Sequence, residues 1–303
     1  MKVVLFGNLY TDKSERYEKL FLAICKKIKE YDIVIYLPTN FFNTLSVGVR
    51  DRIASLIHLY HTDVPEVEFA FSIGGDGTFL RTATAIADYN IPILGINTGR
   101  LGFLADIMFE DLDDTLHEIF NNNYRIENRM LLKTCAITSN SKENVSNNDF
   151  TCYSLNEVAI LKQDTSSMLT IHAYIDEEYL TSYQADGLVI ATPTGSTAYS
   201  LSIGGPIMVP TAPNIILAAI APHSLNTRPL VVDCSSKITL RVESRSDNYL
   251  VALDGVSQTL HVDTVLEICK AKNTQPVVKR IGHTFFETLR NKLMWGADIR
   301  SFK

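Results

Sequence analysis

The sequence predicts two domains: an N-terminal α/β domain with a parallel sheet flanked by helices, and a C-terminal all-β domain of antiparallel, sandwich-like build. Three observations support this. Apolar runs alternate with amphipathic helical patterns through the first third of the chain, as in helix-covered parallel sheets. Short β-rich runs dominate after a polar break at the three asparagines 121–123. A helical pattern then returns at residues 285–294.

The elements of the first domain follow from apolar periodicity and from their end signals. Ser14 is a cap for a helix whose apolar residues recur on one face, and Pro38 stops the second strand. The short apolar runs are typical of buried parallel strands. We expect strands at residues 3–7, 33–37, 69–73 and 93–96, and helices at residues 14–30, 47–60 and 78–89.

The second domain is predicted from seven short runs rich in β-branched and aromatic residues. They lie at residues 134–138, 154–161, 169–175, 188–191, 238–242, 249–253 and 265–269. Residues 139–149 are rich in Asn and Ser, which indicates a mobile hairpin loop. We expect residues 1–126 and 283–303 to form the α/β domain and residues 127–282 the β-rich domain, with the C-terminal helix packing back on the first.

Charge, hydropathy and cysteine content argue against nucleic-acid binding, membrane association and disulfide bonds. The 303 residues carry a formal net charge of −6, so no basic face for nucleic acid is expected. No run of about 18 apolar residues occurs, and the N-terminal run is too short for a signal peptide. The five cysteines are odd in number and lack C-x-x-C spacing. We therefore expect reduced thiols in a cytoplasmic protein, with no membrane partner.

The strongest local motif is Gly-Gly-Asp-Gly-Thr at residues 74–78, between a predicted strand and a predicted helix. Gly75 and Gly77 allow a ligand close to the backbone, and the helix start offers free N–H groups to an anion. Asp76 suits either proton abstraction from a hydroxyl or Mg²⁺ binding. Arg81, one turn later, is placed to reach the same phosphates. A plain turn with an Asp cap and a solvated arginine are the alternatives.

A second loop, residues 97–103, follows the fourth strand. Ligands of open α/β sheets bind at the carboxyl ends of the strands, so this loop is expected to face the same crevice. Phe103 is a candidate wall of an adenine pocket, or simply packs at a domain junction. Neither a Walker phosphate loop nor the G-x-G-x-x-G fingerprint occurs.

Two further motifs lie in the β-rich part. Asn156 and Glu157 form a polar pair flanked by apolar residues, which suits sugar hydroxyls or an edge strand. The run from Asp186 to Gly205 is a buried strand entering a turn rich in Gly, Ser and Thr. Its small side chains leave room for a planar base, its hydroxyls and amides supply hydrogen bonds, and Tyr199 offers a ring or a hydroxyl.

Two histidines, His58 and His61, fall three residues apart at the end of the predicted helix 47–60, with His61 directly after its last residue. That spacing is able to chelate a metal on a helix. No carboxylate with zinc-protease spacing accompanies them, so an exposed polar face is the favoured interpretation.

Taken together, these motifs resemble the NAD kinases in order and spacing, and residues 285–293 resemble the C-terminal helix of that family. The Gly-Gly-Asp-Gly motif is shared with diacylglycerol kinases and phosphofructokinases, whereas residues 192–202 are more specific. The resemblance implies phosphorylation of the adenosine ribose 2′-hydroxyl of NAD, using ATP and Mg²⁺ or another divalent cation. It also implies a homodimer or homotetramer in which a neighbouring subunit completes the site.

The resemblance assigns roles to residues of this chain. Asp76 would be the general base, with Gly77 beside it, Asn156 and Glu157 would contact NAD, and Asp186 would bind the nicotinamide end. The adenosine pocket would be lined by Thr197, Ala198, Tyr199 and Ser202. Gln184 and Ala185 depart from the basic residue that many relatives carry there, which leaves NAD and NADH both open as substrates.

Two alternatives belong to other classes. A lipid kinase would share the Gly-Gly-Asp-Gly motif but would need a greasy pocket. A non-catalytic dinucleotide sensor would bind NAD without turnover, and would not need a base at position 76. The sequence does not identify the phosphate donor, so ATP, another nucleotide and polyphosphate all stay open. It does not identify the metal ligands either.

Overall fold

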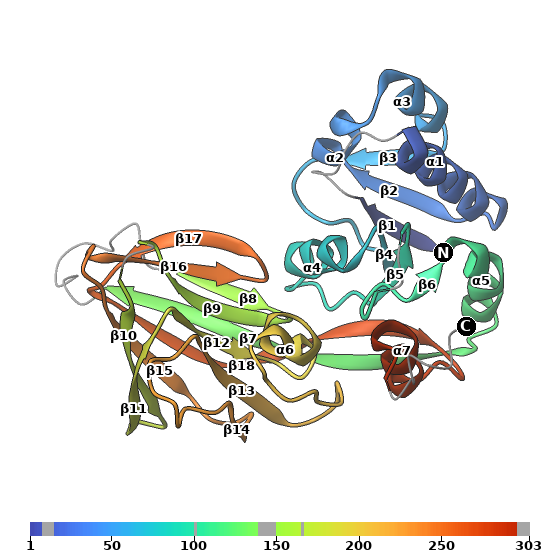
Figure 1. Ribbon diagram of the computed structural model, residues 1–303. Helices are drawn as coiled ribbons and strands as arrows, with labels where there is room; N and C mark the ends of the chain where they lie inside the picture. The colour runs from blue at the N-terminus through green and yellow to red at the C-terminus, as the bar shows by residue number, and fades with distance from the viewer. Residues whose placement is uncertain (8–14, 100–101, 139–149, 165–166, 296–303) are drawn as a thin grey trace. The chain divides into compact units, whose positions relative to one another are not determined.

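The computed structural model describes residues 1–7, 15–99, 102–138, 150–164 and 167–295 (Figure 1). The chain forms two compact units. Unit 1 is Met1–Asn128 with Gln275–Lys303, and unit 2 is Arg129–Thr274. Two long strands, β7 (Tyr124–Thr138) and β18 (Thr264–Arg280), run without interruption from one unit into the other.

Unit 1 contains a parallel sheet in the order β3-β2-β1-β4-β5. The last part of β18 and the short strand β6 both pair with β5 in the parallel sense. The predicted parallel sheet is therefore confirmed. The bounds are β1 (Lys2–Phe6), β2 (Val34–Pro38), β3 (Ile57–Tyr60), β4 (Phe69–Ile73), β5 (Ile93–Asn97) and β6 (Ile107–Met108).

Helices flank this sheet, and one buried cluster joins its alternate strand residues to the apolar faces of α1, α3 and α5. Phe79 of α4 packs against Gly95 of β5, where the missing side chain leaves room for the ring. The helical bounds are α1 (Glu15–Glu30), α2 (Thr39–Thr44), α3 (Val47–Ile53), α4 (Asp76–Ala85), η1 (Phe109–Asp111), α5 (Leu112–Phe120) and α7 (Phe285–Leu293).

The predicted helix 47–60 is wrong in its second half. Helix α3 ends at Ile53, and residues 57–60 form β3, which pairs with β2 in parallel. The open edge of β2 supplies backbone partners that the periodicity of an isolated segment does not reveal. His58 therefore lies on a strand rather than a helix, and both His58 and His61 are exposed.

Unit 2 consists of two antiparallel sheets. The first has the order β14-β13-β12-β9-β16-β17, and the second contains β11, β10, β15, the first part of β18, β7 and β8. The bounds are β8 (Phe150–Ser154), β9 (Glu157–Lys162), β10 (Leu169–Ile175), β11 (Glu178–Ala185), β12 (Gly187–Ala191), β13 (Asn214–Ile220), β14 (Leu230–Asp233), β15 (Ile238–Glu243), β16 (Asn248–Leu253) and β17 (Val256–His261).

One core fills the space between these sheets. Its residues come from both, for example Ile160 and Ile190 from the first sheet and Ile171 and Leu240 from the second. The predicted antiparallel sandwich is therefore confirmed. The outer face of the first sheet is covered by the segment that contains η2 (Gly195–Thr197) and α6 (Tyr199–Ser202).

Three predicted strands of the β-rich part differ from the structure by more than one residue at an end. The expected strand 154–161 is broken at residues 155 and 156, where the chain passes from β8 in one sheet to β9 in the other. Strands 134–138 and 265–269 are only the parts of β7 and β18 in unit 2. The loop expected at residues 139–149 lies outside the described residues.

Candidate functional site

Unit 1 has the strand order of a doubly wound fold: β2 and β3 are added on one side of β1, and β4 and β5 on the other, so the strand order reverses between β1 and β4. Crevices outside the carboxyl ends of the strands at such a reversal bind ligands in open α/β sheets. The end of β4 leads directly into the Gly-Gly-Asp-Gly motif, and Gly75 is the N-cap of α4. The motif thus lies where the fold itself favours binding of an anion.

Asp76 is held by the loop that follows β5. Its Oδ2 accepts the Phe103 N–H at 3.0 Å, and its Oδ1 accepts those of Leu104 and Ala105 at 3.0 and 3.1 Å. A Cβ at Gly102 would overlap this carboxylate, so glycine is required for the loop to close around it. The structure therefore brings the first two predicted motifs together, through Asp76 and Phe103.

The C-terminal helix α7 completes this arrangement. Lys292 places its Nζ 3.3 Å from Asp76 Oδ2 and 4.8 Å from the centre of the Phe103 ring. The helix begins with a Thr284 side chain that accepts the Glu287 N–H, and it buries Leu289. The expectation that this helix returns to the first domain is confirmed.

A cavity of about 210 Å³ lies within unit 1 beside the motif. It is lined at the ends of β1 and β2 by Phe6 and Pro38, at the end of β3 by Tyr60, and on α4 by Thr78 and Arg81. Nη2 of Arg81 donates to Thr78 Oγ1 at 3.4 Å. The predicted arginine thus borders a cavity at the carboxyl edge of the sheet.

Unit 2 uses the same device at Asn156 and Glu157. The partly buried carboxylate of Asp254 accepts the N–H groups of Leu155, Asn156 and Glu157 at 2.7, 2.8 and 3.0 Å. Burial raises the pKa of Asp254, and these three N–H groups oppose that rise. Asp254 has a φ of 48° and starts the Asp-Gly turn between β16 and β17, a typical hairpin connection.

Asn156 and Glu157 each carry a buried side-chain oxygen. Asn156 Oδ1 and Glu157 Oε2 are buried and accept no hydrogen bond within the described part of the chain. The Tyr199 N–H donates to the Glu157 carboxyl. Burial, followed by the nearby Asp254, raises the pKa of Glu157 to about 7. Buried acceptors without partners are costly, so a ligand that donates to them is favoured.

The turn after β12 lies directly against this pair. Thr192 donates its N–H to the Asn156 carbonyl at 2.9 Å and its hydroxyl to the Leu155 carbonyl at 2.6 Å. A Cβ at Gly195 would overlap the Asn156 backbone. The remaining candidates lie on the two short helical turns: Thr197 ends η2, Ala198 follows it, and Tyr199 and Ser202 begin and end α6.

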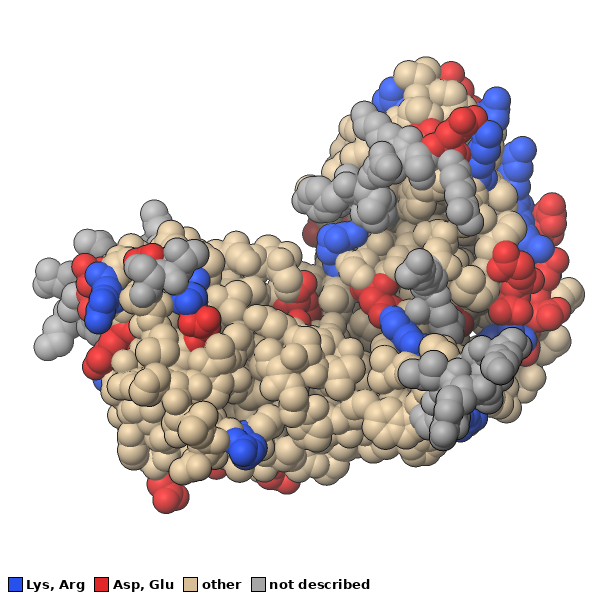
Figure 2. All heavy atoms as spheres, viewed as in Figure 1, with Lys and Arg blue, Asp and Glu red and all other residues tan. Residues whose placement is uncertain are grey.

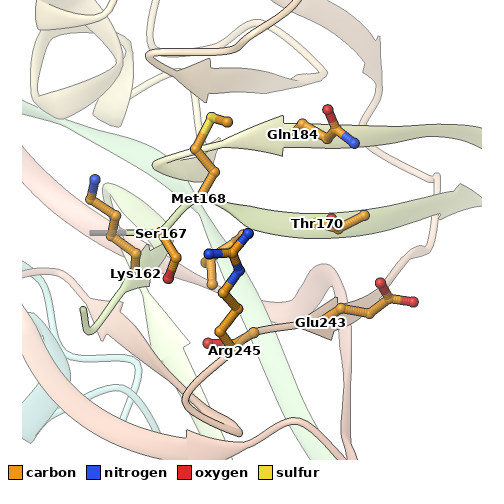
Figure 3. Close-up of a pocket in the computed structure, with 9 residues that line it drawn as sticks. Lys162, Ser167, Met168, Thr170, Gln184, Glu243 and Arg245 are labelled. Carbon is orange, nitrogen blue, oxygen red and sulfur yellow. The ribbon is translucent and has the colours of Figure 1, made fainter. Parts of the chain in front are cut away.

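Asp186 is not part of that cluster. It lies at the opposite end of β12 from the 192–199 turn, a separation on the order of 20 Å at the rise of a β-strand. Lys162 Nζ contacts Asp186 Oδ1 at 2.6 Å. Lys162 also lines a second cavity of about 510 Å³, with Met168, Gln184 and Arg245 around it (Figure 3).

Sequence reasoning missed Asp254 and Lys292. The Asp-Gly pair at 254–255 was a turn signal after a predicted strand, but nothing in the pattern indicated what its carboxylate would contact. Lys292 lies in the helix that the family resemblance covered, yet its position beside Asp76 depends on tertiary packing across more than 200 residues.

Comparison with known proteins gives the family. The ATP-NAD kinase C-terminal domain matches residues 155–280, and the ATP-NAD kinase N-terminal domain matches residues 59–124. An NAD kinase of Bacteroides fragilis is 46% identical over 99% of this chain and 100% of its own. The chain belongs to the NAD kinase family. It is a phosphotransferase that converts NAD to NADP, and the expected activity is confirmed.

Other NAD kinases agree with this assignment. Those of Porphyromonas gingivalis and Flavobacterium johnsoniae are 42% and 39% identical, each over 99% of this chain and at least 99% of their own length. A solved yeast NADH kinase complexed with NADH has a TM-score of 0.85 at 22% identity, covering 100% of this chain and 90% of that one. An Archaeoglobus fulgidus NAD kinase in complex with ATP has a TM-score of 0.71 at 24% identity, covering 97% and 99%. At these identities the two structures show the shared fold.

Among the described residues, no helix combines the length and apolar character needed to cross a membrane. The same residues also contain no group of three or more His, Cys, Asp and Glu side chains arranged to hold a metal ion. On the face shown in Figure 2, acidic and basic side chains lie in small mixed groups on both units.

Proposed function

We propose that this NAD kinase transfers the terminal phosphoryl group of ATP to the 2′-hydroxyl of the adenosine ribose of NAD, with Asp76 as general base. The ribose oxygen forms the new bond to phosphorus while the bond to the bridging oxygen breaks, so ADP leaves with that electron pair and the hydroxyl proton goes to Asp76. The observation that carries the proposal is the position of the Asp76 carboxylate. Asp76 lies at the start of α4, and the backbone N–H groups of residues 103–105 hold its carboxylate in place.

The fixed carboxylate suits this chemistry. Phosphoryl transfer depends mostly on positioning and on neutralisation of charge, so few catalytic side chains are required. Gly75 and Gly77 leave the start of α4 open: among the described residues, a Cβ at Gly75 would meet no side chain or distant backbone within 4 Å, and one at Gly77 would meet only Arg81, at 3.9 Å. Phosphate oxygens are therefore able to approach the backbone N–H groups beside the base.

For unit 2 we propose the role of the NAD site. Asn156 Oδ1 and Glu157 Oε2 would accept hydrogen bonds from hydroxyl groups of the dinucleotide, because these two atoms accept no hydrogen bond within the described residues. We assign the adenosine pocket to the adjoining turn, and we propose separately that the Phe103 ring of unit 1 contacts the nucleotide beside Asp76. The residues of the turn are Thr197, Ala198, Tyr199 and Ser202.

We propose that ATP is the donor and that the 210 Å³ cavity of unit 1 receives part of it. The cavity lies at the carboxyl edge of the sheet and includes Arg81, whose guanidinium suits phosphate. The family profiles are named for ATP-NAD kinases, and the Archaeoglobus fulgidus relative was solved in complex with ATP.

A divalent cation, Mg²⁺ by preference, is part of the proposed reaction. The described residues offer no cage of three or more acidic, His or Cys ligands. Mg²⁺ in nucleotide sites is commonly held by substrate phosphates with one or two carboxylates, so the residues present fit a cation that arrives with ATP. When bound, it would neutralise charge on the phosphates.

We further propose a cytoplasmic homodimer or homotetramer. Asp186 lies far along β12 from the other NAD residues, and a neighbouring copy would allow it to contact the nicotinamide end of a dinucleotide bound elsewhere. The five cysteines are free, which suits a reducing compartment. Light scattering of the purified protein tests the assembly, and a monomer at working concentration would contradict it.

The deciding experiment incubates the protein with NAD, ATP and Mg²⁺ and measures NADP with an NADP-specific dehydrogenase. Because a general base contributes about 10²–10⁴-fold, Asp76→Asn is expected to lose at least about 10²-fold in turnover while keeping its fold and NAD binding. Near-wild-type turnover of this variant would refute the base assignment. NAD binding without any turnover by the wild type would favour a sensor.

A further inference from the structure

The Asp76 carboxylate has no acceptor position left in the structure. A carboxylate offers about four lone-pair positions. Leu104 and Ala105 take two on Oδ1, and Phe103 takes one on Oδ2 with its backbone N–H. The fourth contact is the Lys292 ammonium on Oδ2 at 3.3 Å. If Asp76 accepts a proton from ribose, one of these donors has to leave.

Lys292 is the donor that leaves most easily. The three N–H groups belong to a loop that Gly102 lets close tightly around the carboxylate. The lysine contact is longer than these hydrogen bonds, and the side chains of Lys292 and Asp76 are each 31% exposed. Ion pairs with such exposure contribute little to stability. A flexible four-carbon stem also lets the ammonium move without moving α7.

A bound nucleotide supplies a place for the ammonium to go. The open start of α4 and the guanidinium of Arg81 favour phosphate beside Asp76. Phosphate close to an uncompensated carboxylate is repelled, whereas an ammonium between the two is attracted by both. Phe103 borders this position, since Lys292 Nζ already lies 4.8 Å from its ring.

We propose that Lys292 is a further catalytic residue of the phosphoryl-transfer site. In the ligand-free protein its ammonium occupies the position on Asp76 that the ribose hydroxyl needs. When the hydroxyl binds, the ammonium transfers to the phosphate oxygens of the nucleotide and neutralises charge there during transfer. This assignment rests on the proposed role of Asp76.

The test compares Lys292→Met, Lys292→Arg and the control Arg290→Met with the wild type. Arg290 is exposed and lies in the same last turn of α7. Turnover and the KM values for NAD and ATP are measured with Mg²⁺ present, and NAD binding alone is measured by calorimetry. Lys292→Met is expected to lower kcat at least about tenfold, a lower bound beneath the loss of about 10²–10³-fold that removal of one charge-stabilising donor typically causes, and to raise the KM for ATP.

The accompanying readouts separate catalysis from structure. Lys292→Met is expected to bind NAD as tightly as the wild type or more tightly, because Asp76 loses a competing donor, and its thermal midpoint is expected to match that of Arg290→Met. Lys292→Arg, which keeps the charge, is expected to retain most of the kcat, and Arg290→Met all of it.

Two outcomes would overturn the proposal. One is a Lys292→Met variant with kcat within about twofold of the wild type, since loss of one charge-stabilising donor typically costs about 10²–10³-fold. The other is a joint loss of kcat, NAD binding and thermal midpoint, which would make Lys292 a structural anchor of α7. A failure of the proposed donor and base assignments is distinguishable, because the wild type would then make no NADP from ATP or would not need Asp76.

Discussion

Asp76 and Asp254 play the same structural part in their respective units: each pairs the backbone N–H groups of a bend. Each carboxylate accepts the N–H groups of three consecutive residues, 103–105 for Asp76 and 155–157 for Asp254. A bend that exposes successive N–H groups is costly unless they are paired, and a carboxylate pairs several at once. The two aspartates differ in their proposed roles. Asp76 is itself the proposed base, whereas Asp254 fixes the backbone of Asn156 and Glu157, the proposed NAD contacts.

Glu157 makes stability depend on pH. Its pKa is raised from 4.5 to about 7 by burial and by Asp254. Between these values the unfolded chain loses the proton while the folded protein keeps it, so the free energy of unfolding falls as pH rises. The fall is complete above about pH 7 and is on the order of 3 kcal/mol. Urea unfolding at pH 5 and pH 8 measures it.

The matched variant for this prediction is Glu157→Gln, which keeps the shape of the side chain and does not titrate. Its stability is expected to fall less between pH 5 and pH 8 than that of the wild type. A residual slope is expected, because burial also raises the pKa of Asp254. Equal slopes for the two proteins would show that Glu157 does not carry the effect.

At the scale of single residues, the sequence predicted the candidate site residues better than it predicted the contacts that position them. Asp76, Phe103, Asn156 and Glu157 were candidates because their residue types suit sugars and phosphates. The role of Asp254 could not be predicted from the sequence, because its hydrogen bonds join residues about 100 positions apart. Asp186 was assigned to the same ligand as Asn156, and only the strand register shows that it lies at the far end of β12.

Strand β18 fixes the segment behind the Asp76 loop. Lys279 on β18 contacts Asp106 at 2.6 Å, and the two side chains are only 6% and 9% exposed. Asp106 directly follows Ala105, whose N–H binds Asp76. Arg280 of β18 donates two hydrogen bonds, of 2.8 and 2.9 Å, to the Glu118 carboxylate of α5, and this partly buried pair connects the strand to that helix.

Lys279→Met is expected to destabilise the protein by about 3–5 kcal/mol, because it leaves the Asp106 charge buried without its partner. The double variant Lys279→Met with Asp106→Asn removes that charge and is expected to recover part of the loss. Chemical denaturation measures both. Lys19→Met, which breaks the highly exposed pair with Glu15, serves as control and is expected to change nothing measurable. A double variant no more stable than the single one would contradict the argument.

Element prediction succeeded where local signals agree with pairing. Strand β4 is a short, largely apolar run, and β10 alternates buried apolar with more exposed residues; the predicted and observed limits of both coincide. Prediction failed where tertiary partners decide. β3 exists because β2 has an open edge, and the break between β8 and β9 follows from the Asp254 contacts. Those partners lie outside any local window of sequence.

At the scale of the whole molecule, the two units share continuous backbone. β7 and β18 have 15 and 17 residues and belong partly to each unit. Strand hydrogen bonds are lost cooperatively, so disorder in one unit is expected to weaken the pairing of both strands in the other. The sequence predicted the two folds from their different patterns, but it did not show that single strands run through both.

This continuity predicts that a ligand of one unit protects both. ATP with Mg²⁺ binds unit 1 in our proposal, and at a hundredfold excess over its Kd it adds about 2.7 kcal/mol to the stability of whatever unfolds with its site. Hydrogen exchange in urea, followed by mass spectrometry of peptides from β4 and β12, reads the units separately. We expect a single unfolding transition in both peptides, shifted equally by the nucleotide. Two transitions, with only the β4 peptide shifted, would instead show that β7 and β18 uncouple between the units.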